Sequence, residues 1–431
     1  MDFRVGPPSQ VLEHYTAHGR ATAAQLSNAG VPWLTGGSAG LDVDYASRRD
    51  GTGTLGLAAN LLDATVATPF GWDKPPGEAA NVAATLRLTG DRLVGVDALR
   101  AEGTGLKLVS HATMPAGQPR TLVLDELQLG RTQATGSIAL PSGASGALRV
   151  VLHGSALDLS AYLKQRNSGP QTDEDDETPG RPWDVNLQFG RVILAKDEAL
   201  APASVIAASD GLHILHAEIS AGTKGEVRAS IVPAAGGRRL SVDSADAGAV
   251  LLAAGVADNI RGGKLRLDGS YDDHAPHAPL NGTATLDDFR VIDAPAIGRL
   301  LQAMTLYGAV DLLRGPGLGF RRAVVPFRWQ QRVLHLQSAR AFSTSIGLTA
   351  QGDIDMRRRQ ASVDGTIVPA YFFNQLLGNI PLVGKLFSPE KGGGVFAARY
   401  TVRGKLADPV VSVNALSALT PGFLRGVFGL L

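Results

Sequence analysis

Apolar and polar residues alternate along much of the chain, a pattern typical of β-strands that bury one face only. In the segment 82–88, Val82 and Leu86 fall on one side of an extended backbone, whereas Thr85 falls on the other. The same alternation recurs in three further segments, at 148–153, 185–189 and 396–403. A period of two residues with one polar side predicts half-buried antiparallel strands.

Turn signals separate these alternating segments. Most combine glycine with aspartate or proline, and they lie at Asp50-Gly51, Gly90-Asp91, Pro115–Gly117, Pro141–Gly143, Ala235–Gly237 and Asp364-Gly365. Strand and turn recur about every ten residues, which favours a long meander over alternating strands and helices. The abundance of glycine, 52 residues in 431, agrees with many tight turns.

Helical spacing of apolar residues appears only late in the chain. It predicts helices over Ala247–Ile260 and Ala294–Leu313, and shorter ones over 370–377 and 421–431. Residues 1–240 are therefore expected to be nearly all β, and the remainder to be β with a few helices.

An acidic segment gives the clearest boundary. Five consecutive carboxylates, Asp173–Glu177, are flanked by proline and glycine. Such a run could bind a cation or a basic partner, but mutual repulsion favours a solvated loop. The predicted organisation is a β-meander over 1–167, an acidic flexible linker over 168–182, a continuing β segment over 183–240 and a C-terminal region over 241–431.

Composition narrows the classes of function. The 41 Lys and Arg residues balance 40 Asp and Glu residues, leaving a formal charge of +1, so a nucleic-acid partner is not expected. The chain has no cysteine, which excludes disulfides and cysteine metal ligands. No apolar stretch reaches the roughly 20 residues of a transmembrane helix. The segment Met1–Pro8 does not resemble a secretory signal.

Candidate catalytic motifs are weak. Gly36–Gly40 matches G-x-S-x-G, but Leu41–Tyr45 after it reads as a strand rather than a helix, so we predict a glycine-rich turn. Gly51–Gly56 matches G-x-G-x-x-G, again without the helix that binds a pyrophosphate. His274 and His277 lie among prolines in an expected surface loop. We therefore predict no enzyme activity, no catalytic residue, no metal site and no cofactor.

A long β-meander with almost no helix poses a physical problem, because its apolar side must be covered. The sheet could fold on itself as closed sandwiches or close into barrels. It could also remain an open trough whose apolar interior holds an apolar ligand such as lipid chains. Alternation alone does not decide among the three.

The C-terminal region has a more specific sequence pattern, in which short predicted strands alternate with apolar segments interrupted by proline and glycine. The positions that carry it are Gly365, Val368, Pro369, Asn374, Leu376, Leu377, Gly378, Ile380, Pro381, Gly384, Phe396, Tyr400, Val402, Gly404, Pro409, Val413, Asn414, Pro421, Gly422 and Arg425. This succession resembles the C-terminal region of the AsmA-like family of bacterial envelope proteins. Residues 1–240 are similar to the family only in their general pattern of strands and turns.

The resemblance implies a mainly β fold. Its long twisted antiparallel sheet would be curled into an open apolar groove, with a few α-helices in the C-terminal half. It also implies a periplasmic location in association with the inner membrane. Family members typically carry an N-terminal anchor, and since none is seen here we expect a part of a longer or split polypeptide.

The function that the resemblance implies is non-catalytic. The groove would carry acyl chains of phospholipid, or of another lipid, between the inner and outer membranes, with membrane or envelope proteins as partners at its ends. Thirteen motif residues would then serve structure or contacts at a groove end: Pro369, Asn374, Gly378, Ile380, Pro381, Gly384, Tyr400, Gly404, Pro409, Asn414, Pro421, Gly422 and Arg425. The alternative is a structural or assembly factor for the outer membrane, with closed β-sandwich cores and no ligand.

Overall fold

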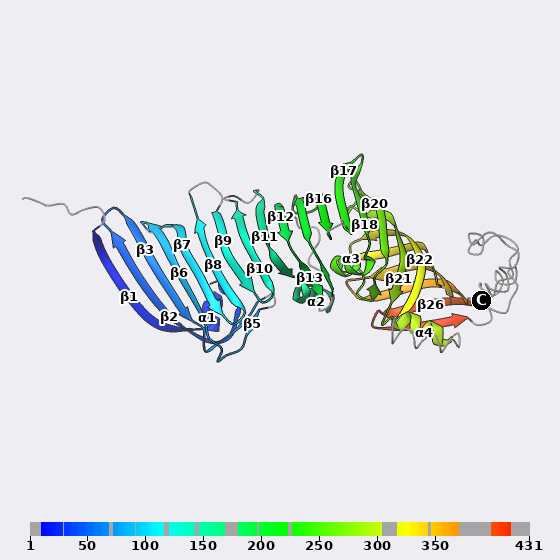
Figure 1. Cartoon of the computed structure of the whole chain (residues 1–431), viewed down its shortest axis with the longest axis horizontal. Helices are drawn as coiled ribbons and strands as arrows, with labels where there is room; N and C mark the ends of the chain where they lie inside the picture. The colour runs from blue at the N-terminus through cyan, green and yellow to red at the C-terminus, as the bar shows by residue number, and fades with distance from the viewer. Residues whose placement is uncertain are drawn as a thin grey trace, which may run out of the picture. The chain divides into compact units, whose positions relative to one another are not determined.

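The computed structural model is mainly β, and its sheet is not closed into a barrel (Figure 1). It describes residues 10–28, 30–68, 72–90, 92–115, 120–141, 143, 146–168, 180–195, 198–222, 226–303, 317–343, 346–369 and 398–414. The expectation of a mainly β chain with an open, curled sheet is confirmed.

The chain divides into two compact units. The chain passes from the first unit to the second between residues 214 and 224, where short segments belong alternately to each. Unit 1 consists of Met1–Gln165, Pro179–Ile214 and Ala221–Thr223. Unit 2 consists chiefly of Lys224–Leu431. Strand β16 (Ile214–Ala221) lies at the exchange, well before residue 241, where the sequence placed the start of the C-terminal region.

Unit 1 is built on a run of strands in which each strand is hydrogen-bonded to the next. In spatial order they are β1 (Val11–Thr22), β2 (Leu34–Arg48), β3 (Thr52–Asn60), β6 (Ala80–Thr89), β7 (Arg92–Gly103), β8 (Leu106–Thr113), β9 (Arg120–Leu129), β10 (Thr132–Leu140), β11 (Leu148–Asp158), β12 (Trp183–Phe189) and β15 (Ala203–Ser209). All the predicted alternating segments of this unit lie within these strands.

The sheet of unit 1 is mixed rather than purely antiparallel. Strand β11 runs parallel to β12 and also to the short strand β13 (Val192–Ala195), which pairs with β14 (Glu198–Leu200). A parallel neighbour requires a long return of the chain. That return includes helix α2 (Ser160–Ser168) and the predicted acidic linker, of which residues 169–179 lie outside the described part.

One end of the unit 1 sheet has a small core of its own. Strand β4 (Ala64–Ala67), strand β5 (Asp73–Lys74) and helix α1 (Ala23–Asn28) gather there. Its buried residues are Leu34, Ala39, Leu61, Ala64, Val66, Trp72 and Ala80. Two helices thus occur in the half of the chain that was expected to be nearly all β.

The G-x-S-x-G motif is not the predicted glycine-rich turn, because it lies inside strand β2. That strand pairs with β4 up to Gly37 and with β1 from Ser38 onward. Gly37 has a φ of +74°, and a Cβ there would lie 2.0 Å from the carbonyl oxygen of Asp63. Glycine is therefore needed where the strand changes partner, which is a structural requirement.

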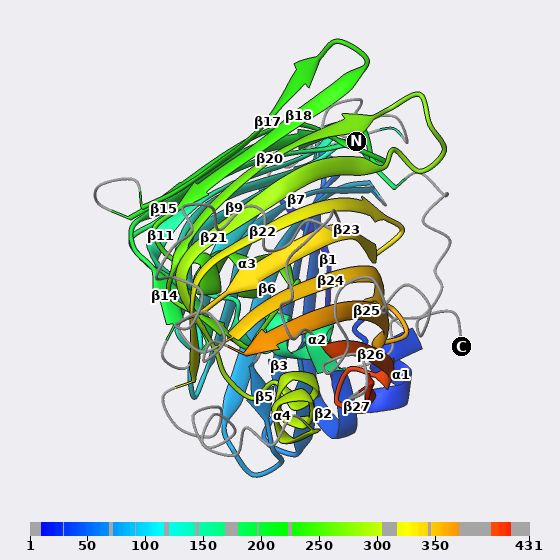
Figure 2. The same ribbon diagram turned by 90° about the vertical axis from the view of Figure 1, so that its right-hand side faces the viewer.

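The sheet of unit 2 is antiparallel at every strand pairing from β17 to β27 within the described residues. Figure 2 shows its strands following one another around a curl. In spatial order they are β17 (Val227–Ala234), β18 (Gly237–Ser244), β20 (Lys264–Asp272), β21 (Leu280–Val291), β22 (Leu318–Gln330), β23 (Val333–Phe342), β24 (Ile346–Asp355), β25 (Gln360–Pro369), β26 (Ala398–Lys405) and β27 (Asp408–Asn414). The short strand β19 (Ile260–Arg261) pairs with β21.

Two helices contribute to the core of unit 2. Helix α3 (Ala247–Ala254) begins at Asp246, whose carboxylate accepts the amide hydrogen of Ala249, and it ends at Gly255 in the left-handed conformation. It is shorter than the predicted helix over 247–260 because this glycine terminates it. Helix α4 (Pro295–Ala303) packs against β27. Residues 304–313 of the second predicted helix, and both shorter predicted helices, lie outside the described residues.

The predicted turn at Asp364-Gly365 is instead the middle of strand β25. Gly365 lies directly opposite Tyr400 of β26, and a Cβ at Gly365 would meet the tyrosine ring at 2.6 Å. Glycine in a strand often marks such a close approach. The aromatic ring covers the backbone here, so the glycine serves sheet packing rather than chain reversal.

Candidate functional site

One side of the unit 1 sheet is apolar from the first strand to the last. Residues that lie opposite each other in neighbouring strands project to the same side. Following the register across the sheet therefore traces one row, which we call the apolar row: Tyr15, Tyr45, Leu55, Leu86, Val96, Ala112, Leu122, Ile138, Val150, Val185 and Ala207. We call the side of the sheet that carries it the apolar face.

The adjacent row, on the opposite side of the same strands, has a different composition. It contains His14, Ala46, Thr54, Arg87, Gly95, Thr113, Thr121, Ala139, Arg149, Asp184 and Ala208. None of these is an apolar residue larger than alanine. Period-two alternation is thus kept in register over the whole sheet, and it separates an apolar face from a polar face.

The apolar row is only partly covered. Its two buried members are Ala112 and Ala207, 6% and 8% exposed, while the larger members are half-buried or exposed. At the end of the row Tyr15 is 61% exposed, and its ring stacks on Tyr45 at 6.3 Å between centroids. A second packed layer would bury such side chains almost completely. The apolar face of unit 1 is therefore accessible over much of its area.

The corresponding row of unit 2 is more deeply buried. It runs through Leu265, Leu286, Ala323, Ala341, Leu348, Ile367 and Ala398. Leu265 is 3% exposed and Ile367 is fully buried. This core includes Ala247 of α3 and Leu300 of α4. The two units therefore differ in how far their apolar sides are accessible.

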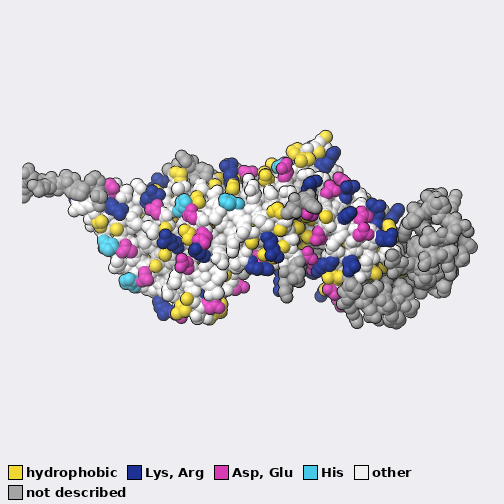
Figure 3. Space-filling model, viewed as in Figure 1, with side chains coloured by type: hydrophobic (Ala, Val, Ile, Leu, Met, Phe, Trp, Pro, Cys, Tyr) yellow, Lys and Arg dark blue, Asp and Glu magenta, His cyan; other side chains and the backbone are white. Residues whose placement is uncertain are grey.

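The polar face of unit 1 carries paired charges and histidines, which Figure 3 shows spread over the strands. On the first two strands His14 contacts Asp44 at 2.8 Å and His18 contacts Asp42 at 2.5 Å. These side chains are more than half exposed. Exposed pairs of this kind contribute at most about 1 kcal/mol each, so the polar face is a solvated surface.

A buried lysine binds backbone carbonyl groups at the edge of unit 1 near β4 and β5. Lys74 is 2% exposed, and its Nζ donates to the carbonyl oxygens of Ala64 at 2.8 Å and Pro75 at 3.0 Å. Nearby, Nε1 of Trp72 donates to the carbonyl oxygen of Thr104 at 2.8 Å. The lysine satisfies carbonyl groups that a turn would otherwise leave unpaired. Its role is thus to hold this end of the sheet together.

Five of the thirteen motif residues lie in the described part of the chain, and they gather on β25, β26 and β27. They are Pro369 at the end of β25, Tyr400 and Gly404 on β26, and Pro409 and Asn414 on β27. The others, Asn374, Gly378, Ile380, Pro381, Gly384, Pro421, Gly422 and Arg425, lie outside the described residues.

Two of the described motif residues have packing roles. The hydroxyl of Tyr400 donates to the carbonyl oxygen of Thr349 at 2.7 Å, and burial, aided by the charge of Asp364, raises the pKa of Tyr400 to about 12. Pro409 is fully buried, and its carbonyl oxygen accepts a hydrogen bond from Arg299 of α4. Both contacts stabilise the last two strands.

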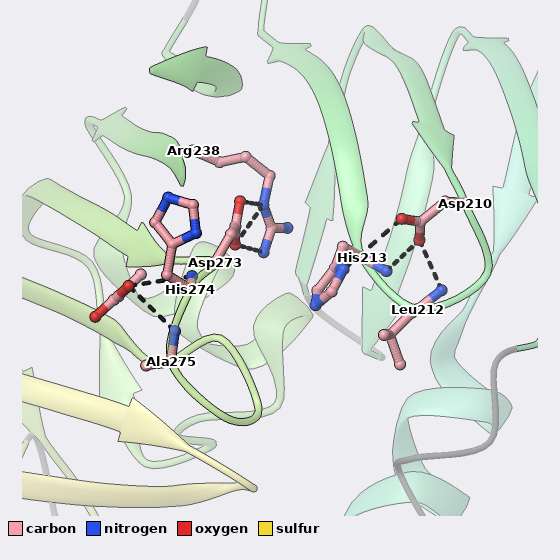
Figure 4. A network of polar contacts seen from close by, with 8 residues as sticks. Asp210, Leu212, His213, Arg238, Asp273, His274 and Ala275 are labelled. Carbon is pink, nitrogen blue, oxygen red and sulfur yellow. Dashed lines mark hydrogen bonds and ion pairs between the residues drawn. The ribbon is translucent and has the colours of Figure 1, made fainter. Parts of the chain in front are cut away.

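Polar networks in the turns are local (Figure 4). In unit 1 the carboxylate of Asp210 accepts the amide hydrogens of Leu212 and His213, and the bond from His213 is the main cause of its lowered pKa. In unit 2 Asp273 accepts Arg238 Nε at 2.9 Å and a second guanidinium nitrogen at 2.6 Å.

The Asp273 pair is part of a larger stack. The guanidinium of Arg238 lies 4.2 Å over the ring of Tyr271, and burial raises the pKa of this tyrosine. The neighbouring His274 follows Asp272, whose carboxylate accepts its amide hydrogen. Among the described residues no group of three histidines and carboxylates could hold a metal ion.

Leu86 and Val150 lie in two of the alternating segments that the sequence predicted as strands, over 82–88 and 148–153, and the structure brings both into the apolar row. The sequence could not identify the row itself. The register passes through bulges, such as the one between Val96 and Leu99, that change which residues share a side.

Comparison with known proteins gives no relative. No protein-family model matches the chain, and neither a curated protein nor a solved structure matches it significantly. The likeness to the AsmA-like family therefore stays a prediction. Within the described residues, no helix is both long and apolar enough to cross a membrane.

Proposed function

We propose that this protein is a non-catalytic lipid-binding scaffold that holds acyl chains against the apolar face of unit 1. The observation that carries the proposal is the apolar row, whose larger side chains stay half-buried or exposed within a folded sheet. Soluble proteins rarely expose such a continuous apolar surface unless it binds something. Acyl chains fit because the face is long, continuous and without buried charge along its row.

The mechanism needs no chemical step. Each methylene group that leaves water is worth about 0.8 kcal/mol, so a chain of ordinary length would be held by burial alone. Headgroups would remain in water at the margin of the sheet. Since successive strands present similar apolar residues, a chain could move from strand to strand without a large barrier. The resemblance to envelope proteins supports transport of phospholipid between two membranes from a periplasmic position next to the inner membrane.

The packed core of unit 2 favours a second, structural role for that part of the chain. Its apolar side includes helical residues such as Ala247 and Leu300 in one core with the strands. Unit 2 would then serve as a folded platform, as expected of an assembly factor without ligand. If unit 1 also binds no lipid, this structural role would extend to the whole chain.

A pair of adjacent valines gives a matched test of lipid binding. Val150 belongs to the apolar row, opposite Ile138 and Val185, whereas Val151 projects to the polar face, opposite Ser137 and Asn186. The substitutions Val150→Lys and Val151→Lys therefore add the same charge to neighbouring positions of one strand. Uptake of a phospholipid with a fluorescent acyl chain by the detergent-free protein is the measurement.

We expect Val150→Lys to weaken uptake at least about tenfold, because the ammonium group must be desolvated beside the acyl chain. Val151→Lys should leave uptake within about twofold of the unmodified protein. Circular dichroism would verify that both variants fold. Equal uptake by both variants, or none by the unmodified protein, would rule out the apolar face as the lipid site.

A further inference from the structure

One long edge of the unit 1 sheet carries an arginine at each successive chain reversal. The connections β2–β3, β6–β7, β8–β9 and β10–β11, and the segment entering β12, all lie along the upper edge of this sheet in Figure 1. They carry what we call the edge arginines: Arg49, Arg92, Arg120, Arg149 and Arg181. Register assigns Arg92, opposite Thr89, and Arg149, opposite Asp184, to the polar face, but each is the first or second residue of its strand and so lies at the margin of the sheet. Neighbouring strands lie about 4.8 Å apart, so the first four recur every two strands, at intervals of roughly 10 Å.

The edge arginines are exposed, and none forms an ion pair with another described residue. The carboxylate of Asp50 at the same edge accepts two hydrogen bonds from Thr52, and its side-chain bond to that threonine is the main cause of its lowered pKa. That carboxylate is thus held within its own turn. The guanidinium groups remain available to an external anion.

Basic residues near the opposite edge are mostly occupied. Arg20 pairs with Asp63, Arg131 pairs with Asp158 at 2.7 Å, and Lys74 is buried against carbonyl groups. The two long edges of the same apolar face therefore differ in chemistry. Exposed Arg100 and Arg191, toward the opposite edge, also lack an ion pair with a described residue. An amphiphile lying across this face would therefore meet more available positive charge at the edge that carries the edge arginines.

We propose that the edge arginines bind the phosphate groups of phospholipids whose acyl chains lie on the apolar face. This inference rests on the proposed function and adds the class of lipid and its orientation. Guanidinium groups bind phosphate oxygens through two parallel hydrogen bonds, with charge assistance. All bound lipids would point their headgroups to the arginine edge, and a lipid with a net negative headgroup would be bound more tightly than an uncharged lipid with the same chains.

The test compares two double variants of the full chain. Arg92→Gln with Arg120→Gln removes two edge arginines. Arg100→Gln with Arg191→Gln removes the same charge from exposed arginines of unit 1 that also lack an ion pair with described residues. Arg100 lies eight positions further along β7 than Arg92, about 27 Å along the strand.

Dissociation constants would be measured for short-chain fluorescent phosphatidylglycerol and for diacylglycerol with the same chains, both below the concentration at which they aggregate. For phosphatidylglycerol we expect the Kd to rise about five- to thirtyfold in the edge variant and to stay within twofold in the control. The Kd for diacylglycerol should change in neither. Raising the salt concentration should weaken phosphatidylglycerol binding more in the unmodified protein than in the edge variant.

Three results would overturn the proposal. The two double variants could weaken phosphatidylglycerol binding equally, which would indicate that only the net charge of the protein matters. The edge variant could also bind diacylglycerol more weakly, which would indicate a structural defect. It could also lose flotation with phosphatidylglycerol vesicles while keeping its affinity for the monomeric lipid, which would make the edge a membrane-docking surface.

Failure of the proposed function itself would give a different set of results. In that case the unmodified protein binds neither lipid, and Val150→Lys changes nothing. If Val150→Lys abolishes binding of both lipids while the edge variant behaves like its control, the lipid site stands and only its headgroup contacts are refuted.

Discussion

Truncating one leucine in each unit tests whether the apolar face of unit 1 is accessible. Leu86 is a half-buried member of the apolar row, whereas Leu265 of unit 2 is 3% exposed and lies opposite Leu286. Complete burial of a leucine side chain is worth about 1.5–3 kcal/mol. A half-buried leucine that leaves no cavity should therefore cost about 1 kcal/mol when it becomes alanine. Leu265→Ala removes packed atoms and should cost about 2–5 kcal/mol.

Hydrogen exchange in increasing urea measures the two costs separately, because peptides from β6 and β20 report on their own units. Lipid-free protein should lose about 1 kcal/mol of opening free energy around β6 with Leu86→Ala, and at least twice that around β20 with Leu265→Ala. With saturating phospholipid the cost of Leu86→Ala should increase, since the leucine then contacts acyl chains. Equal costs in lipid-free protein would refute the reasoning, because Leu86 would have to pack under a cover.

Two further predictions concern unit 2. Burial raises the pKa of Tyr400 to about 12 against an ordinary value near 10, so the unfolded chain ionises first and Tyr400 should lower stability by about 2–3 kcal/mol between pH 10 and 12. Tyr400→Phe should cost about 1 kcal/mol at neutral pH and should reduce the alkaline loss in urea titrations, leaving the part due to Tyr271, whose pKa burial also raises. A Tyr400→Phe protein with the same alkaline slope would contradict the assignment. Asp246→Ala removes the N-terminal cap of α3 and should lower the free energy of unfolding of unit 2 by about 1 kcal/mol. Asp246→Asn keeps a capping oxygen and should lower it by only a few tenths of a kcal/mol. Equal thermal melting temperatures of the unmodified protein and both variants would show that the cap contributes nothing.

Much of the fold is predictable from alternation, because one polar side per strand is a local property of the chain. The strand over residues 82–88 needs no information beyond its own residues, and it is found within β6. The parallel pairing of β11 with β12 was not predictable, since it depends on where a long connection returns the chain. Gly365 misled the prediction for a related reason: the tyrosine that packs over it is distant in sequence.

The candidate site was predictable in kind but not in position. Alternation indicates an apolar side that few helices could cover, yet it does not tell which strands remain accessible. In unit 2 residues of α3 and α4, such as Ala247 and Leu300, share the core, whereas the row through Leu86 and Val150 stays half-buried. The edge arginines could not be recognised at all, because only the spatial order of the turns aligns them.

Native mass spectrometry of the detergent-free full chain, combined with lipid extraction, tests the central claim most directly. If acyl chains cover the apolar face, the protein should carry one or more phospholipid molecules, and Val150→Lys should remove them while Val151→Lys does not. A folded, lipid-free protein that takes up no phospholipid when it is offered would contradict the account. It would leave a structural or assembly role as the function of this chain.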